Sequence, residues 1–445
     1  MNPEIFHLSS PRPHKIMFAP HAHYAAAGRG FSRRTLLRAA AAGAAAGSLP
    51  FADLMAADAA GLRKRGKAMI LLWMAGAPSQ FETFDPKPGA AAGGETKAIP
   101  TAAPGVRIAE HWPNVAGAAG DVAFVRSLTN NEGNHLRAAY QWHTGYAPTG
   151  SVRHPSVAAG VVQQIAPGGL DLPASVSIGP GGREGGAGGG FLGVKYDPLA
   201  VPKPGSPPAH TGGSVGAPRA RRRLELMERL GAGFAERGGA GVAETHRELY
   251  DAAERLSLGP DLAAFGLDDE PRALRDKYGD TDFGRGCLLA RRLVERGVTF
   301  VEVRLPGWDT HNDNFARVKT LAAQADPAFA ALVGDLRDRG MLDDTLVLWA
   351  GEFGRTPKIN ARGGRDHYPR AFNCALAGGG VRGGQVVGGT TQDGSAVKDR
   401  PVRVDDLWRT CCTALGVDAD HEHLSPLGRP LRVIDGGEPV GELFG

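Results

Sequence analysis

Short apolar runs alternate along this chain with longer segments in which apolar residues recur at helical spacing. The strand-like runs are residues 68–74, 122–125, 298–305 and 345–350, and the helical segments include 282–296 and 315–339. Apolar strands separated by amphipathic helices are typical of a parallel sheet that helices cover on both faces. The pattern therefore predicts an α/β fold, a three-layer αβα sandwich with a mostly parallel central sheet.

Two further segments interrupt this pattern. Residues from about 167 to 218 are rich in glycine and proline, which predicts an irregular insertion over the surface. Residues from about 220 to 277 place charged and apolar residues at helical spacing and are expected to pack as an accessory pair of helices. No internal repeat is evident. The alternation of strands and helices favours one large domain, residues 60–445, that contains both insertions.

The N-terminus has the pattern of a twin-arginine export signal. Residues 32–38 (SRRTLLR) precede a run of mostly alanine and glycine from Ala39 to Ala52, and residues 57–59 offer a small-residue cleavage site. That run has 14 residues, whereas a spanning helix needs roughly 20 strongly apolar ones, so no permanent membrane span is expected. We interpret residues 1–59 as a signal peptide and N-terminal extension, and expect the mature protein to be periplasmic or secreted.

Charge and cysteine content exclude two classes of function. The formal net charge is +4, but residues 1–60 contain six Lys or Arg and three Asp or Glu, so the remainder carries only +1. No basic run with interleaved aromatic residues occurs, and the arginines at 219–223 are interpreted as a solvated helix start, so no nucleic-acid partner is expected. The four cysteines have no CxxC spacing and are interpreted as mostly buried thiols rather than a zinc knuckle.

Polar residues follow two of the predicted strands, where ligands bind in open parallel sheets. Asp309 and His311 come after the strand at 298–305, Glu352 comes after the strand at 345–350, and Asp366 and His367 lie in the next loop. Each has a structural explanation alone: a helix cap, a loop carboxylate, a surface pair. Together, carboxylate and imidazole suit zinc, manganese or iron, whereas calcium alone would use oxygen ligands. The combination predicts a divalent metal site, for zinc first, with manganese, iron or calcium as alternatives.

Three long motifs carry a resemblance to a known family. The segments 68–89, 283–314 and 342–379, with the motifs GWDTHNDN, GEFGRTP and GRDHYP, resemble the exported bacterial family of domain of unknown function 1501 over nearly the whole mature chain. That family is similar in turn to the alkaline phosphatase and sulfatase superfamily, whose members place two metals at the carboxyl end of a parallel sheet. The resemblance implies that fold and a hydrolase of anionic esters.

The superfamily pattern transfers unevenly to this chain. Asp309 and His311 resemble the ligands of the first metal, although the superfamily more often spaces them by four, and His367 resembles the later histidine of that site. Glu352 sits where the Asp-His pair of the second metal follows a strand, but Phe353 takes the place of the histidine. The first strand lacks the usual metal-binding aspartate at its end, and only Glu82 and Asp85 lie nearby. The resemblance implies an intact first metal site and a depleted second one.

The nucleophile expected from the resemblance is missing. His143-Thr144-Gly145 resembles the Thr-Gly segment that follows a sulfatase nucleophile, and the residue nine positions before Thr144 is His135. No cysteine precedes Cys287, so a formylglycine made from cysteine is excluded. His135 could be a nucleophile, a general acid, a third imidazole ligand or a helix cap.

Two arginines and one serine are further candidates. Arg137 or Arg355 could hold an anionic group bidentately or pair with Glu352 or another carboxylate. Ser79 follows a strand as a nucleophile would, but it lacks the Gly-x-Ser-x-Gly elbow and ranks below metal-activated water.

Three functions are compatible with these residues. The first is an exported metal-dependent hydrolase of phosphate or sulfate esters, acting on a small molecule or a glycan. The second is a non-catalytic exported binding protein that uses its metal for structure or to hold anionic glycans. The third is an iron site of two histidines and one carboxylate, built from His311, His367 and one acid. The sequence identifies neither the substrate nor the oligomeric state.

Overall fold

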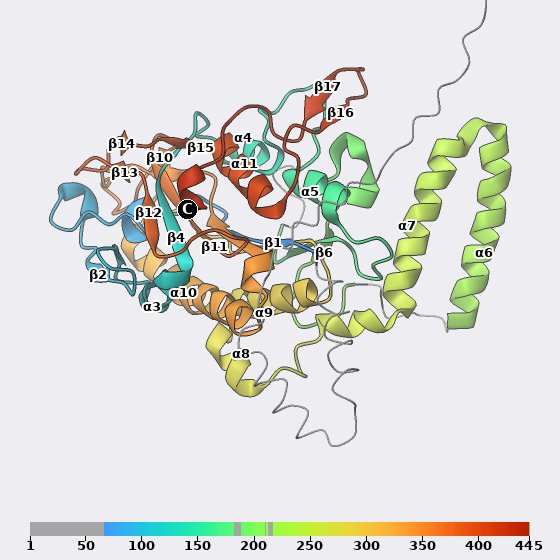
Figure 1. Ribbon diagram of the computed structural model, residues 1–445, viewed down its shortest axis with the longest axis horizontal. Helices are drawn as coiled ribbons and strands as arrows, with labels where there is room; N and C mark the ends of the chain where they lie inside the picture. Colours follow the sequence, from blue (N-terminus) through green and yellow to red (C-terminus); the bar gives the residue numbers. More distant parts are fainter. Residues whose placement is uncertain (1–65, 182–187, 210, 212–216, 445) are drawn as a thin grey trace, which may run out of the picture. The chain divides into compact units, whose positions relative to one another are not determined.

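A computed structural model describes residues 66–181, 188–209, 211 and 217–444 of the chain. Its centre is a sheet of nine strands, in which eight lie in the order β12-β4-β11-β8-β1-β7-β5-β6 and β15 also pairs with β4 (Figure 1). The strands are β1 (Ala68–Trp73), β4 (Val122–Thr129), β5 (Ser175–Ile178), β6 (Leu199–Val201), β7 (Phe300–Arg304), β8 (Thr345–Ala350), β11 (Phe372–Ala377), β12 (Gln385–Val387) and β15 (Val402–Arg403). Only β11 pairs antiparallel to its neighbours, β4 and β8, so the sheet is mostly parallel.

Helices cover both faces of this sheet because its strands are apolar on both faces. Along β1, Ile70 and Leu72 belong to the core on one side, and Met69, Leu71 and Trp73 belong to the core on the other. The first core contains residues of α3 (Pro113–Ala118), α8 (Arg272–Tyr278), α9 (Asp282–Glu295) and α10 (Asn314–Asp338). The second contains residues of α4 (His135–Thr144), α5 (Val157–Ile165) and α11 (Val404–Leu415). The predicted three-layer αβα sandwich is confirmed.

The stretch predicted as an irregular insertion, residues 167–218, requires a correction. It contributes β5 and β6 to the edge of the central sheet, where both pair in parallel. Strands of three or four residues bounded by glycine and proline are too short to show a periodicity. The segment predicted to be a helical insertion, residues 220–277, contains most of α6 (Ala217–Phe234), all of α7 (Ala240–Leu258) and most of α8.

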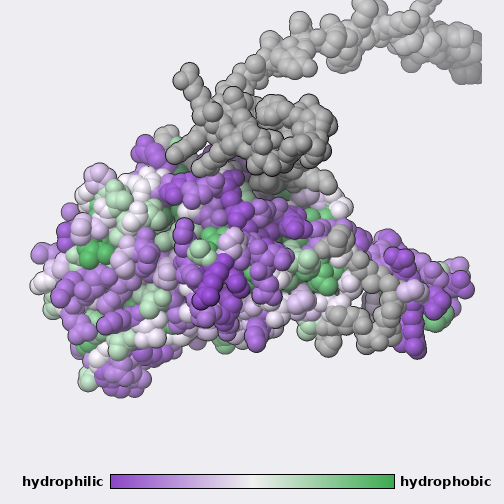
Figure 2. Space-filling view, turned by 90° about the horizontal axis from the view of Figure 1, so that it is seen from below, coloured by the Kyte–Doolittle hydropathy of each residue, from purple (hydrophilic) through white to green (hydrophobic). Residues whose placement is uncertain are grey.

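The remaining strands form small two-stranded sheets at the periphery: β2 (Ala98–Pro100) with β3 (Arg107–Ala109), β9 (Gly354–Arg355) with β10 (His367–Tyr368), β13 (Gly389–Thr390) with β14 (Val397–Asp399), and β16 (Glu422–Leu424) with β17 (Pro430–Arg432). On the face seen in Figure 2, hydrophilic residues predominate and hydrophobic ones are scattered in small groups. Among the described residues, no helix has the length and apolar character needed to cross a bilayer. The predicted export signal, residues 1–59, lies outside the described residues and stays a prediction.

Candidate functional site

The candidate site lies at the carboxyl ends of three adjacent parallel strands, β8, β1 and β7. Asp309 and His311 follow β7, Glu352 follows β8, and His367 opens β10. His135 is the first residue of α4, whose N-cap Asn134 accepts a hydrogen bond from a backbone N–H of the first turn. The fold therefore brings together residues that are up to 232 positions apart in the sequence, from His135 to His367.

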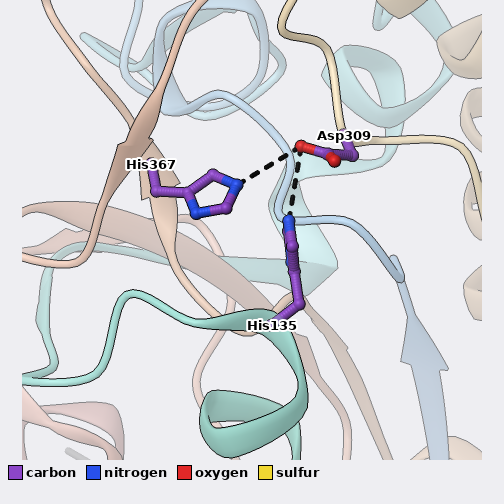
Figure 3. Close-up of side chains that lie close together, drawn as sticks. All are labelled: His135, Asp309 and His367. Atoms are coloured by element: carbon purple, nitrogen blue, oxygen red, sulfur yellow. Dashed lines mark ion pairs between the residues drawn. The ribbon is translucent and has the colours of Figure 1, made fainter.

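Three imidazole rings converge on one carboxylate oxygen. The Nε2 atoms of His135, His311 and His367 lie 3.3, 3.1 and 3.5 Å from Oδ1 of Asp309. Figure 3 shows the rings of His135 and His367 pointing at Asp309 from different elements. His135, Asp309 and His367 also form the group of potential ligands whose atoms all lie within 4.8 Å of one another. We call His135, Asp309, His311 and His367 the histidine cluster.

The opposite ring nitrogen of each histidine has an acceptor. Nδ1 of His135 lies 2.6 Å from Oε1 of Glu352, and Nδ1 of His311 lies 2.8 Å from Oδ1 of Asp366. Nδ1 of His367 lies 2.8 Å from the carbonyl oxygen of Gly133, which can only accept. Each Nδ1 can donate a proton to its acceptor, and a neutral ring in that tautomer presents the lone pair of Nε2 to the cluster. Partners of this kind orient the histidine ligands of metal sites.

This arrangement leaves several electron-rich atoms facing one another. Nε2 of His311 lies 3.0 Å from Nε2 of His367, and the buried Nε2 of His135 has no hydrogen-bond partner. A shared cation relieves such repulsion. Ligand atoms at about 2.0–2.2 Å from a tetrahedral zinc ion lie roughly 3.3–3.6 Å apart, close to the 3.0–3.5 Å distances that join Asp309 to each ring and His311 to His367. His135, Asp309 and His367 form the group of potential ligands for a divalent metal such as zinc, and His311 lies beside them.

Arg355 neutralises part of the negative charge of Asp309 from the buried side of the site. Its side chain is fully buried, and Nη2 donates to Oδ1 of Asp309 at 2.6 Å. Burial raises the pKa of Asp309, but the hydrogen bond and charge of Arg355 outweigh that effect and bring the pKa to about 2. Asp309 is therefore ionised at every pH at which the protein would work.

The pKa values of the other titratable groups shift in opposite directions: they favour the charged forms of His135 and Asp366 and the neutral form of His367. Burial lowers the pKa of His135, but its hydrogen bond and charge interaction with Glu352 outweigh burial and raise that pKa overall. Burial and the neighbouring His135 lower the pKa of His367. The hydrogen bond with His311 lowers the pKa of Asp366, which favours its ionised form.

Two glycines of the motifs allow close backbone approaches at the site. Gly76, after β1, has φ +108°, and a Cβ there would lie 2.5 Å from the backbone nitrogen of Asp309. Its N–H also donates to Oε1 of Glu352 at 3.0 Å. A Cβ on Gly364 would overlap the carbonyl oxygen of His311. Side chains at either position would push the loops of the cluster apart.

The predicted site residues fall into three groups: those of the histidine cluster, those that hydrogen-bond to its rings, and the two arginines. Asp309, His311 and His367 meet in one cluster with His135. Glu352 and Asp366, predicted as ligands or as orienting groups, hydrogen-bond to imidazole Nδ1 atoms and therefore orient the rings.

The two arginines were predicted either to hold an anionic group or to pair with a carboxylate, and in the structure both pair with carboxylates. Arg355 pairs with a carboxylate, Asp309, and gives its other donors to the backbone carbonyls of residues 76, 77, 308 and 365. Arg137 is 55% exposed and pairs with Glu132 at 2.6 Å. The helical turn after His135 carries Arg137 away from the cluster, so neither guanidinium is free to bind substrate there.

The residues at the positions where the resemblance would place a second metal make other contacts. Phe353 is fully buried, and its ring centroid lies 4.8 Å from those of both His135 and His367. Glu82 is buried against Arg365, and Asp85 bonds to Lys87 and to Thr390. Apolar packing and ion pairs thus occupy the groups from which a second site would be built.

Ser79 and the four cysteines, which were also considered in the sequence, do not belong to the histidine cluster. Ser79 is fully buried and its hydroxyl has no hydrogen-bond partner, so it is not presented to a substrate. The four cysteines are free and buried, as predicted. Sequence reasoning missed the carbonyl of Gly133, because backbone acceptors leave no signature in residue type.

Replacing Asp366 by asparagine is expected to weaken zinc binding by about 10-fold, because second-shell partners of histidine ligands contribute about 10- to 100-fold. The amide still accepts from Nδ1 of His311 but no longer stabilises charge on the ring. Chelator competition measures the affinity. Asp313→Asn, an exposed change two residues after His311 at φ 48°, is the control and should bind zinc like the unchanged protein; equal affinities for all three proteins would contradict the orienting role.

The comparisons with known proteins agree with the motifs. The model of the family described as "Protein of unknown function (DUF1501)" matches residues 66–444. No curated protein matches the chain. Among solved structures, the chain is similar to PsFucS1 sulfatase from Pseudoalteromonas sp., with TM-score 0.36 and 14% identity over 81% of this chain and 71% of that one.

It is also similar to phosphonate monoester hydrolase SpPMH from Silicibacter pomeroyi, with TM-score 0.37 and 12% identity over 85% of this chain and 76% of that one. A third is a protein in the alkaline phosphatase superfamily from Vibrio parahaemolyticus, with TM-score 0.37 and 12% identity over 80% and 67% of the two chains. Such distant similarities leave the activity to be argued from the site itself. Because the family match extends over nearly all the described residues, the chain belongs to the family of domain of unknown function 1501.

Proposed function

We propose that this protein is an exported metal-dependent hydrolase of phosphate or sulfate esters, with one divalent metal, zinc first among the candidates, in the histidine cluster. The observation that carries the proposal is the convergence of three Nε2 atoms on Oδ1 of Asp309, with an acceptor beside Nδ1 of each ring. A divalent cation held there would supply Lewis-acid chemistry, polarising the ester and favouring ionisation of water near neutral pH.

Residues around the histidine cluster hold its side chains in fixed orientations. Glu352 and Asp366 fix the orientation of two rings, and the carbonyl of Gly133 fixes the third. Arg355 fixes Asp309 from the buried side, while the side chain of Asp309 remains 45% exposed. An anionic ester would therefore approach from the open side, over His311, whose side chain is 31% exposed. No hydroxyl or thiol nucleophile joins the described cluster, which favours attack by water.

The decisive experiment measures metal content and turnover together. Metal-replete protein is expected to hydrolyse an aryl phosphate or an aryl sulfate between about pH 5 and 9, where histidine and metal-activated water titrate. Chelation should abolish turnover, and added zinc should restore it. If neither ester is hydrolysed at any pH in that range, the hydrolase proposal is wrong and the protein is a metal-containing binding protein for anionic ligands.

His135→Ala tests the role that geometry favours for this residue. If His135 is an imidazole ligand, the alanine variant should lose zinc affinity and turnover in parallel, each by about 100-fold or more, because the cation loses one of its ligands. If turnover falls while bound zinc stays unchanged, His135 transfers protons instead. Arg137→Ala, two residues along the same helix, is the matched control and should change neither quantity.

A further inference from the structure

Outside the site, the hairpin of α6 and α7 presents an open apolar groove. The two helices run antiparallel, side by side, and are joined by residues 235–239 (Figure 1). The groove between them has a volume of about 900 Å³. Its apolar lining comes from both helices: Leu224, Met227, Leu230, Phe234, Val242 and Tyr250. We call this surface the hairpin groove.

The side chains of the hairpin groove are unusually exposed for their type. Leu230 is 66% exposed, Val242 is 57% exposed, and Phe234 is 47% exposed. Single exposed apolar residues are ordinary, but a contiguous set along two facing helices marks an interaction surface. We therefore expect a partner to cover the hairpin groove.

The hairpin is held to the rest of the described chain through α7. Leu256 of α7 belongs to the hydrophobic core together with Phe265, and Lys195 pairs with Glu248 at 3.3 Å. The main neighbours of α6, in contrast, are α7 and the turn that joins the two helices. Most helical stability comes from burying an apolar face. Helix α6 packs mainly against α7 and the joining turn, and several of its apolar side chains stay exposed.

The two helices carry opposite net charge. Helix α6 has five arginines and two glutamates, whereas α7 has two arginines and four acidic residues. Within one chain, Arg221 and Glu254 already approach to 3.7 Å across the hairpin. A second hairpin that placed its α7 against this α6 would pair two helices of opposite net charge and cover the apolar lining.

We propose that the hairpin groove is the interface of a homodimer, in which two hairpins pair about a two-fold axis that runs along the helices. Each α6 then lies between its own α7 and the partner's α7, so every adjacent pair is antiparallel and of opposite charge. The same surface serves both copies, as two-fold symmetry requires. The product is a four-helix bundle with the groove residues in its centre.

The size of the hairpin is sufficient for such an interface. Helices of 18 and 19 residues are about 27 Å long, and two of them side by side are about 20 Å wide. A face of this size contributes roughly 550 Å² from each copy, before side-chain relief is added. The total is close to the roughly 1,200 Å² at the lower end of specific interfaces.

Sedimentation velocity on the purified metal-replete protein tests this proposal. The unchanged protein is expected to sediment as a dimer at micromolar concentration, and Leu230→Glu and Val242→Glu are each expected to weaken the dimer by about 100-fold or more, since each buries a charge. The matched control is Leu226→Glu, which is on the same helix and 56% exposed but does not line the groove. It should remain dimeric.

Circular dichroism and bound zinc verify that each variant keeps its fold. A monomeric unchanged protein would overturn the proposal. So would a dimer that persists in both groove variants, or one that Leu226→Glu disrupts equally. The readout is independent of ester hydrolysis, so the dimer and the proposed activity can fail separately.

Discussion

Replacing Asp309 by alanine is expected to weaken zinc binding by about 1,000-fold or more, which corresponds to about 4 kcal/mol of binding free energy. Oδ1 of Asp309 is the atom on which all three imidazoles and Arg355 converge. Without it, a divalent cation would lose its anionic ligand and would face the Arg355 guanidinium, which stays charged at any working pH. Competition with a chromophoric chelator measures the affinity.

Asp309→Asn provides the matched comparison, because the amide keeps the shape of the side chain and loses only its charge. Its zinc affinity should lie between those of the unchanged protein and Asp309→Ala. An alanine variant that binds zinc as tightly as the unchanged protein would show that the three histidines hold no metal at Asp309. A variant that lost its fold would be recognised by circular dichroism.

The central layers of the fold could be predicted because their sequence signal is local. The runs at 68–74, 298–305 and 345–350 are buried on both faces in β1, β7 and β8, and the helical segments 282–296 and 315–339 correspond to α9 and α10. The short strands β5 and β6 could not be predicted, because their extended conformation depends on hydrogen bonds that β5 makes with β7 and with β6. The antiparallel orientation of β11 is also set by tertiary packing rather than by its residues.

The candidate site was predictable where ligands follow strands and obscure where they do not. Asp309 and His311 are in sequence next to the end of β7, so the sheet rule places them at one edge. His135 opens a helix far from these loops, and spacing alone left its role undecided. Only the three-dimensional arrangement gives its ring the same lone-pair orientation as those of His311 and His367.

The arginines show why residue type alone left two roles open. A guanidinium suits both anionic substrates and buried carboxylates, and burial decides between these uses. Arg355 is enclosed and gives its donors to Asp309 and to backbone carbonyls, so it supports a ligand rather than a substrate. Arg365 is likewise buried and gives its donors to a carboxylate and to backbone carbonyls, and the sequence motif gave no indication of this role.

Arg365 joins the loop of the cluster to the core. Its fully buried guanidinium donates to Oε1 of Glu82 at 2.7 Å and to the carbonyls of Ala92, Thr356 and Pro357. It also lies over the ring of Phe81, at 4.5 Å from the ring centroid. The next two residues in the chain are Asp366 and His367, so this ion pair holds one side of the site.

Arg365→Met is therefore expected to lower the free energy of unfolding by about 3–5 kcal/mol, because it leaves the carboxylate of Glu82 buried without a counter-charge. The double variant Glu82→Leu with Arg365→Met removes both charges and should regain most of that loss, since buried pairs can be replaced by apolar residues at little cost. Arg362→Met, an exposed change in the same loop, should be silent. Denaturant unfolding measures all three variants. A single variant within about 1 kcal/mol of the unchanged protein, or a double variant no more stable than the single one, would mean that Glu82 and Arg365 do not act as a pair, since coupled residues show interaction energies of about 0.5–3 kcal/mol.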